Sequence, residues 1–200
     1  IWSHPISGES RILVVGIASG PLVDIVTVEY AGIGLTKAHE RANTVMNVSI
    51  WYLVAPPKGV ADIRVTSSAL TYMIGGAHSY TGVSQAGPIG NIASAEGNNS
   101  LPTITVTSDT SEVVVDVIGV AGLFPSTGLH QTIKHVNQEA GLYGAGSSEE
   151  GKAVTEMGWT LAVSADWSII GMALMPEPGA LPVGLHSFNA EALENEVLVE

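Results

Sequence analysis

The 200-residue sequence contains no cysteine. This absence excludes disulfide bonds and thiolate metal sites, so the fold must be stabilised by packing alone. Charged residues make up only 13% of the chain, which is about half the usual share in globular proteins. Ser, Thr, Asn and Gly supply the polarity instead. Such a surface is typical of secreted proteins, or of chains whose faces are covered by neighbours.

Positive charge is especially scarce. Lys and Arg together number 7 against 19 Asp and Glu, and the formal net charge is −12. A nucleic-acid-binding surface needs clustered cations to displace counterions, and the sequence has no such cluster. We therefore expect no nucleic-acid partner.

Long apolar runs are also missing, because no stretch approaches the roughly 18 residues of a membrane span. We expect no membrane span. The chain opens at Ile1 without a basic and apolar leader. We expect that either a signal peptide has been removed or the sequence starts inside a longer chain. We favour export, and hence a secreted, extracellular or particle-surface location.

The hydrophobic pattern has a period of two almost everywhere. Alternating apolar residues occur in 26–30, 63–65, 104–106 and 113–117, as expected of strands with one face on a core. The continuous apolar runs "RILVVGIA" and "WSIIGMAL" indicate central strands that are covered on both faces. Gly and Pro punctuate these runs every 8–15 residues or so, as in antiparallel sandwiches and barrels. Only 37–43 and 131–140 show helical periodicity, enough for a turn or two.

The stretch from Val45 to Val54 is predicted to form a wall of the fold. One of its faces is apolar throughout, whereas the other changes from polar residues to Trp51 and Leu53. A strand with this pattern is partly covered on its second face by another segment. Pro56 and the proline after it cannot donate ladder hydrogen bonds, so they end the strand.

Six segments carry a resemblance to a known group of modules. They are "WSHPISGESRILVVGI", "VTVEYAGIGLTKA", "IWYLVAPPKGVADIRVTSS", "GAHSYTGVSQAGPIG", "SLPTITVTSDTSEVVVDVIG" and "MGWTLAVSADWSIIGMALMP". In this order they resemble β-sandwich modules that recur in large, mostly uncharacterised secreted and surface proteins of prokaryotes and their viruses. The resemblance spans Trp2 to Pro176. It implies an all-β, jelly-roll-like antiparallel sandwich in an extracellular or particle-surface setting, and it offers no catalytic residues to transfer.

We therefore predict a sandwich domain over residues 1–177 and an extended acidic tail over 178–200. From Pro176 onward the chain has five glutamates and no Lys or Arg. The tail is expected to dock on a neighbouring subunit, to donate a strand to it, or to be a free linker.

Two glycine-rich segments resemble nucleotide-binding motifs incompletely. Residues 146–153, "GSSEEGKA", approach a P-loop, but Ala153 replaces the hydroxyl residue that would hold Mg²⁺, and the segment leads into a predicted strand. Gly32 and Gly34 lack the third glycine and the following helix of a dinucleotide site. Both segments are expected to be turns, and we predict no cofactor.

Candidate catalytic and metal-binding residues are equally weak. His135 and Glu139 would share a face only on a helix, and two ligands are too few for a metal site. No dense acidic loop surrounds the turn acids that could bind calcium. Four strand carboxylates alternate with core residues and are expected to point outward, which predicts solvated faces and no glycosidase pair. They are Glu29, Asp62, Asp116 and Glu156. We predict that the protein is not an enzyme.

Aromatic residues and sequons suggest two surface roles. Trp159 and Trp167 lie in apolar patterns and are expected in the core, whereas Trp2 and Trp51 are candidates for a glycan-stacking platform. Asn47 and Asn98 fit the N-glycosylation pattern. We expect Asn47 on the outer face of its strand and Asn98 in a turn.

Low charge on outward strand positions favours a chain that associates with copies of itself, because monomeric sandwiches usually guard their edges with Lys or Pro. We predict a structural subunit of an extracellular filament, surface layer or virion. The alternative is a carbohydrate-binding or adhesive module, and a hydrolase explains the sequence least. The predicted subunit contacts are Ile1, Trp2, Trp51, Leu53, Leu181, Val183 and Leu185.

Overall fold

The computed structural model describes residues 1–122, 126–128, 130–179 and 183–193. Within these ranges every regular element is a β-strand, and every strand pairing is antiparallel. The prediction of an all-β antiparallel sandwich is confirmed. No helix of the length and apolar character needed to cross a membrane occurs in the described part of the chain.

The strands run in chain order from β1 to β17. They are β1 (Trp2–Ile6), β2 (Ile12–Ser19), β3 (Ile25–Tyr30), β4 (Ile33–Gly34), β5 (Thr36–Ala42), β6 (Asn47–Val54), β7 (Gly59–Ser67), β8 (Met73–Thr81), β9 (Ile89–Asn99), β10 (Thr103–Val106), β11 (Val113–Ala121), β12 (Ser126–Thr127), β13 (Thr132–Glu139), β14 (Leu142–Glu150), β15 (Thr155–Thr160), β16 (Ala165–Leu174) and β17 (Gly184–Leu193).

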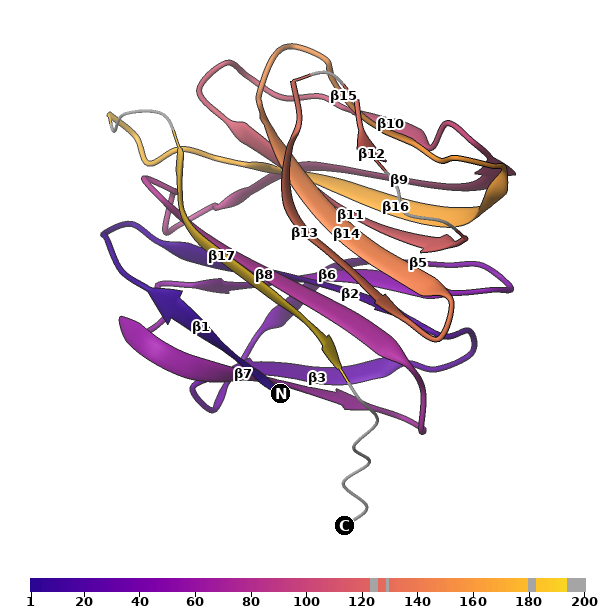
Figure 1. Ribbon diagram of the computed structural model, residues 1–200. Helices are drawn as coiled ribbons and strands as arrows, with labels where there is room; N and C mark the ends of the chain where they lie inside the picture. Colours follow the sequence, from indigo (N-terminus) through magenta and orange to yellow (C-terminus); the bar gives the residue numbers. More distant parts are fainter. Residues whose placement is uncertain (123–125, 129, 180–182, 194–200) are drawn as a thin grey trace.

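The strands form four stacked layers (Figure 1). The first outer sheet has the order β1-β7-β3-β4, and the first inner sheet has the order β17-β8-β2-β6-β5. The second inner sheet has the order β13-β14-β11-β16-β9, and the second outer sheet has the order β10-β15-β12. We call the first two layers the first sandwich and the last two the second sandwich.

Three hydrophobic cores separate the four layers. One lies inside each sandwich, and the third lies between the two inner sheets. The inner sheets are therefore covered on both faces, which explains why β2 and β16 are buried almost throughout. The prediction from their continuous apolar runs is confirmed. Trp159 and Trp167 lie in the core of the second sandwich, as predicted.

The two sandwiches repeat one strand arrangement. The order β5-β6-β2-β8 in the first inner sheet corresponds to β13-β14-β11-β16 in the second, and β1-β7-β3 corresponds to β10-β15-β12. The registers also correspond, since Ile12 lies opposite Tyr80 and Val113 lies opposite Leu174. Positions related in this way are called equivalent below. The repeat cannot be recognised by comparing residue identities, because strand pairing constrains the pattern of apolar and polar residues more than the residue types themselves.

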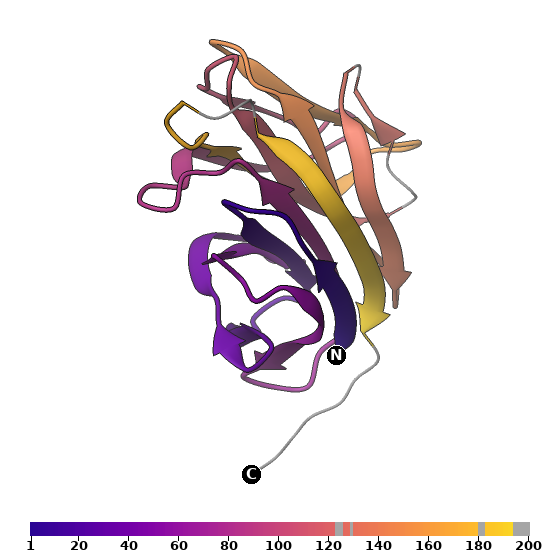
Figure 2. The same cartoon turned by 90° about the vertical axis from the view of Figure 1, so that its left-hand side faces the viewer.

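Each sandwich receives its last strand from the other half of the chain. β9 follows β8 along the chain but pairs with β16, whereas β17 follows β16 but pairs with β8. The two connecting segments cross at a bridge between Val83 and Pro176. Near the centre of the molecule the equivalent residues Gly16 and Val117 meet, and a Cβ at Gly16 would lie 2.3 Å from the Val117 side chain. Figure 2 shows the exchanged strand β17 against the first sandwich.

The short helical turns expected in 37–43 and 131–140 are wrong, because these segments form β5 and β13. Both strands have a register shift, between Lys37 and His39 and between Ile133 and His135. A bulge adds one residue and changes the side-chain phase, which breaks the period of two. The resulting sequence pattern imitates a helical one.

The predicted tail contains β17, which pairs with β8 of the same chain. Strand addition by this segment thus takes place within the chain in this structure. Leu181 and residues 194–200 lie outside the described residues. The predicted domain range of 1–177 spans both sandwiches.

Candidate functional site

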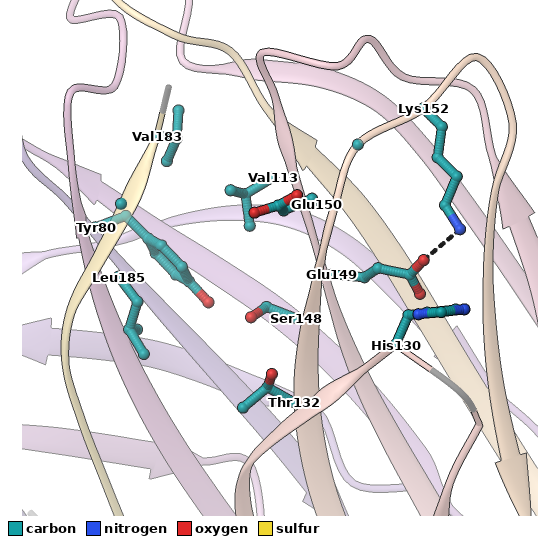
Figure 3. A pocket seen from close by; sticks show the side chains of 12 residues that line it. Tyr80, Val113, His130, Thr132, Ser148, Glu149, Glu150, Lys152, Val183 and Leu185 are labelled. Atoms are coloured by element: carbon teal, nitrogen blue, oxygen red, sulfur yellow. Dashed lines mark ion pairs between the residues drawn. The ribbon is translucent and has the colours of Figure 1, made fainter. Parts of the chain in front are cut away.

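A pocket of about 730 Å³ opens between the two sandwiches, where the edge strand β13 faces the exchanged strand β17 (Figure 3). Its walls come from both sandwiches and from the turn after β14. The lining residues are Tyr80, Val113, His130, Thr132, Ser148, Glu149, Glu150, Gly151, Lys152, Val183, Gly184 and Leu185. We take this pocket as the candidate functional site.

The end of β14 presents side chains to both sides of its sheet. Ser148 and Glu150 lie opposite Val115 and Val113, which belong to the core between the sandwiches. Glu149 lies opposite Val114, which belongs to the core of the second sandwich. Because successive side chains in a strand point to opposite faces, the pocket extends around the end of β14.

Three hydroxyl groups converge on the inner side of the pocket. Figure 3 shows Tyr80, Ser148 and Thr132 directed toward one another from β8, β14 and β13. Tyr80 is fully buried, and this burial raises the pKa of its hydroxyl, which stays protonated. The hydroxyl faces Ser148, but their geometry falls short of a hydrogen bond. The Ser148 and Thr132 hydroxyls can therefore still donate to or accept from a ligand.

Glu149 and Lys152 form an ion pair on the other side of β14, with 2.5 Å between Oε1 and Nζ. The Glu149 side chain is only 3% exposed, whereas that of Lys152 is 51% exposed. The second carboxylate oxygen, Oε2, is buried and has no hydrogen-bond partner within the described residues. Leaving a buried acceptor unsatisfied is costly, so this oxygen calls for a donor from outside the chain.

The equivalent positions of the first sandwich explain why the pocket lies here. Ser148, Glu149 and Glu150 correspond to Tyr52, Leu53 and Val54. Tyr52 packs against the core between the sandwiches. The second sandwich therefore has a small hydroxyl and two carboxylates where the first has an aromatic and two aliphatic side chains, and this difference leaves the pocket unfilled.

The opposite junction, where β5 meets β9, is closed by polar contacts. His39 Nε2 lies 3.0 Å from Ser94 Oγ, and Arg41 Nε lies 3.3 Å from Glu96 Oε2. These contacts join the two sandwiches directly across the junction.

A buried histidine pair lies at the junction of β13 with β8. His78 Nε2 lies 2.9 Å from His135 Nδ1, so one ring donates to the other. Gly76 and Gly146 leave room for the His135 ring. Burial lowers the pKa of His135 to about 4 and that of His78 well below its usual value. Both rings are therefore neutral at physiological pH.

His4 forms a second buried contact nearby, with its Nε2 3.3 Å from Ser79 Oγ. Burial lowers the pKa of His4 to about 4. Ser187 of β17 joins this group, since its Oγ lies 2.6 Å from Ser79 Oγ and donates to the Pro5 carbonyl oxygen at 2.7 Å. Among the described residues, no three His, Asp or Glu side chains come together in a way that could hold a metal ion.

Asp116 does not point into solvent, so its predicted outward position is wrong. It lies between the second inner and outer sheets, where Trp159 Nε1 donates to it at 2.6 Å and Ser147 donates from both N and Oγ at 2.7 Å. Burial raises the pKa of Asp116 to about 6, against the effect of these donors. Alternation alone missed this site because β11 has cores on both faces.

The predictions for the other strand carboxylates stand. Asp62 and Glu156 are exposed and Glu29 is partly exposed. The segment from Gly146 to Ala153 leads toward β15, as predicted, but residues 146–150 belong to β14, so the prediction of a turn is wrong for them. It nevertheless lines the pocket, which no motif indicated.

The predicted surface tryptophans are buried. Trp2 packs over Gly75, and Trp51 donates to Ser49 Oγ at 2.9 Å, both in the core of the first sandwich. Leu53 is partly buried against the same core. A stacking platform built on these two tryptophans is therefore wrong. The second face of β6 is covered, as predicted for residues 45–54, but the cover is more complete than the partial cover predicted.

The remaining predicted contacts differ in exposure. Ile1 is half-exposed, and Leu185 is partly exposed in the pocket wall. Val183 is buried against the core between the sandwiches.

The two sequons also differ. Asn47 is buried, with its Nδ2 donating to Glu40 Oε1 at 2.5 Å and to the Val23 carbonyl oxygen at 3.3 Å, so its predicted exposure is wrong. Asn98 is exposed near the end of β9, paired with Asp166, rather than in a turn.

The pocket and the histidine pair both escaped sequence reasoning, because each depends on how the two sandwiches stack. The signal that could have revealed them is the equivalence of β5-β6 with β13-β14, including the shared bulge before His39 and His135.

Comparison with protein-family models, curated proteins and solved structures gives no match to this chain.

Proposed function

We propose that the chain is a non-enzymatic structural subunit of an extracellular or particle-surface assembly, such as a filament, a surface layer or a virion. The observation that carries this proposal is the reciprocal strand exchange, in which β9 and β17 each complete the sandwich of the other half. A sheet that is completed by a strand from elsewhere in the chain can be completed equally by a strand from a neighbouring copy.

β17 is the strand through which copies would join. Among the described strands it pairs with β8 alone, at the edge of the first inner sheet. Moving β17 to β8 of a neighbouring copy replaces each lost hydrogen bond with an identical one, so the balance depends on protein concentration and on the connecting segment. Ile1 immediately precedes β1, and β1 packs beside β17. Ile1 would therefore also contact the neighbouring copy.

The outer face of the second sandwich suits close packing between subunits. The face of the second outer sheet carries Thr103, Thr105, Ser126 and Thr160 with one charged residue, Glu156. Hydroxyl-bearing side chains lose less hydration on burial than charged ones. This face can therefore pack against a neighbour at a low desolvation cost.

The proposal is tested by the mass and shape of the purified full chain over a range of concentrations. Multi-angle light scattering and negative-stain imaging should show oligomers, rings or filaments that increase with concentration. Linking β17 to its own β8 with a disulfide in Ser79→Cys/Ser187→Cys should prevent strand transfer when oxidised and permit it when reduced. These residues lie directly opposite one another, within the geometry of a disulfide, and the chain has no other cysteine.

A matched disulfide between β9 and β16, Asn98→Cys/Asp166→Cys, serves as the control because these residues are also direct partners. It should leave assembly unchanged if β17 is the joining strand. A monomer at every concentration would reject the structural role. Assembly that persists with oxidised Ser79→Cys/Ser187→Cys would reject strand transfer but retain association through faces.

The second candidate function is a carbohydrate-binding or adhesive module. The burial of Trp2 and Trp51 removes its original support. The pocket between the sandwiches favours it instead, because its lining combines hydroxyls, carboxylates and an apolar wall. A glycan array probed with the full chain tests this function independently of assembly.

A further inference from the structure

We propose that the pocket between β13 and β17 binds a neutral sugar residue. This inference deepens the second candidate function and does not depend on self-association. The site consists of the inner hydroxyls, the carboxylates of Glu149 and Glu150, Lys152, and an apolar wall. Its volume of about 730 Å³ is in the range of sites that enclose small molecules.

The charge pattern of the lining selects against anions. Glu149 and Glu150 would repel an anion, and Lys152 is already paired with Glu149. A hydroxyl group donates to a carboxylate and also accepts from an ammonium. A ligand that carries several neutral hydroxyls can therefore satisfy both kinds of side chain at once.

Glu149 Oε2 provides the anchoring acceptor. It is buried, belongs to a side chain that is 3% exposed, and lacks a hydrogen-bond partner within the described residues. A sugar hydroxyl that donates to this oxygen forms a charge-assisted hydrogen bond, which is shorter and stronger than a bond between neutral groups. The bond would also remove the cost of the unsatisfied acceptor.

The inner part of the pocket suits the ring of a sugar. The hydroxyls of Tyr80, Ser148 and Thr132 converge there (Figure 3). Val113, Val183 and Leu185 supply apolar surface beside them. Sugar rings have C–H faces that pack on apolar side chains, while their hydroxyls meet the polar groups that fix orientation.

Binding should first be measured on a glycan array of neutral oligosaccharides and then by saturation-transfer NMR with the free sugars that bind. Ser148→Tyr introduces the residue found at the equivalent position of the first sandwich, so it should fill the pocket and abolish binding. Glu150→Gln keeps the shape but removes a charge, and it should weaken binding about tenfold. Glu156→Gln, on the exposed face of the second outer sheet, is the matched control and should bind like the wild type.

Inorganic phosphate and spermine serve as anionic and cationic probes in the same NMR experiment. Neutral-sugar binding that is lost in Ser148→Tyr and reduced in Glu150→Gln supports the proposal. Absence of neutral-sugar binding, stronger binding of either ion at this pocket, or sugar binding that both variants retain would overturn it. Circular dichroism of each variant confirms that the fold is kept. Light scattering on the same samples separates this result from the test of self-association.

Discussion

The two sandwiches have one strand arrangement but different interiors. At the equivalent positions on their central strands, Val15 lies in an apolar core, whereas Asp116 lies in a buried network with Trp159 and Ser147. The junction of β5 with β9 is closed, whereas the junction of β13 with β17 contains the pocket. The shared backbone supplies the scaffold, and the residues that depart from the repeat mark where the second sandwich is specialised.

The difference at the centre of the sandwiches predicts the largest effect. Asp116→Val introduces the residue of the first sandwich and leaves the Trp159 and Ser147 donors without an acceptor. Each unsatisfied buried donor costs about 1–3 kcal/mol, so we expect a loss of about 4 kcal/mol in the free energy of unfolding. Urea denaturation at pH 7 measures it. Asp116→Asn retains one acceptor oxygen and should lose about half as much. A loss below about 1 kcal/mol in Asp116→Val would show that the network is not stabilising.

The histidine junction predicts the next effect. Gly76→Ala places a Cβ 2.3 Å from the His135 ring, and overpacking of this kind costs about 1–3 kcal/mol. Gly34→Ala is the control, because no atom lies within 4 Å of its Cβ position. Combining Gly76→Ala with His135→Ala should recover part of the loss, and a double-mutant cycle measures this coupling. Additive effects would contradict contact between the two positions.

Acid should destabilise the chain through the buried histidines. The pKa values of His4 and His135 are lowered to about 4 in the folded state, so their contribution is present above about pH 6.5 and is lost as the pH falls toward 4. Each can lose about 2 kcal/mol between pH 7 and 5. Thermal unfolding from pH 7 to 4.5 measures the sum. A melting temperature independent of pH in this range would contradict the buried neutral state.

Asp116 acts in the opposite direction. Its pKa is raised to about 6 in the folded state, so its contribution to stability is full below about pH 4 and is lost as the pH rises through 6. Asp116→Asn removes this opposing effect. Between pH 7 and 5 the free energy of unfolding of this variant should therefore fall by about 1 kcal/mol more than that of the wild type.

Tyr52→Ser tests whether the junctions differ because of one side chain. It places at the junction of β5 with β9 the serine found at the equivalent position 148 of the pocket. Removing a partly buried aromatic ring should lower the free energy of unfolding by about 2 kcal/mol. The variant should also gain a cavity beside β5, which a crystal structure would show. A collapsed junction with no cavity would mean that the backbone, rather than residue 52, keeps this side closed.

Sequence patterns predicted the parts of this molecule that depend on local alternation. The continuous runs of β2 and β16 indicated strands covered on both faces, and the Pro pair after Val54 marked the end of β6. Alternation gave the wrong burial wherever the second face of a strand was covered by another core. Asp116, Asn47 and Trp51 were all assigned by assuming that an inner sheet has one solvent face, whereas each of them is buried.

The site itself was beyond sequence reasoning for a related reason. Glu149 and Tyr80 are distant in sequence and come together only because β8 and β14 belong to sheets that stack. Periodicity assigns residues to faces but does not state which sheets pack together. The bulges before His39 and His135 concealed the repeat further, because they replaced a strand-like period with a helical one.

Arg41→Ala tests the polar contact at the closed junction and should have the smallest effect. Arg41 and Glu96 have side chains that are 40% and 36% exposed, and exposed ion pairs contribute about 0–1 kcal/mol because solvent screens them. We expect a loss of no more than about 0.5 kcal/mol in urea denaturation, and a smaller one in high salt. A loss above about 1.5 kcal/mol that high salt does not reduce would contradict this expectation, because closure would then depend on this contact as well as on the packing of Tyr52.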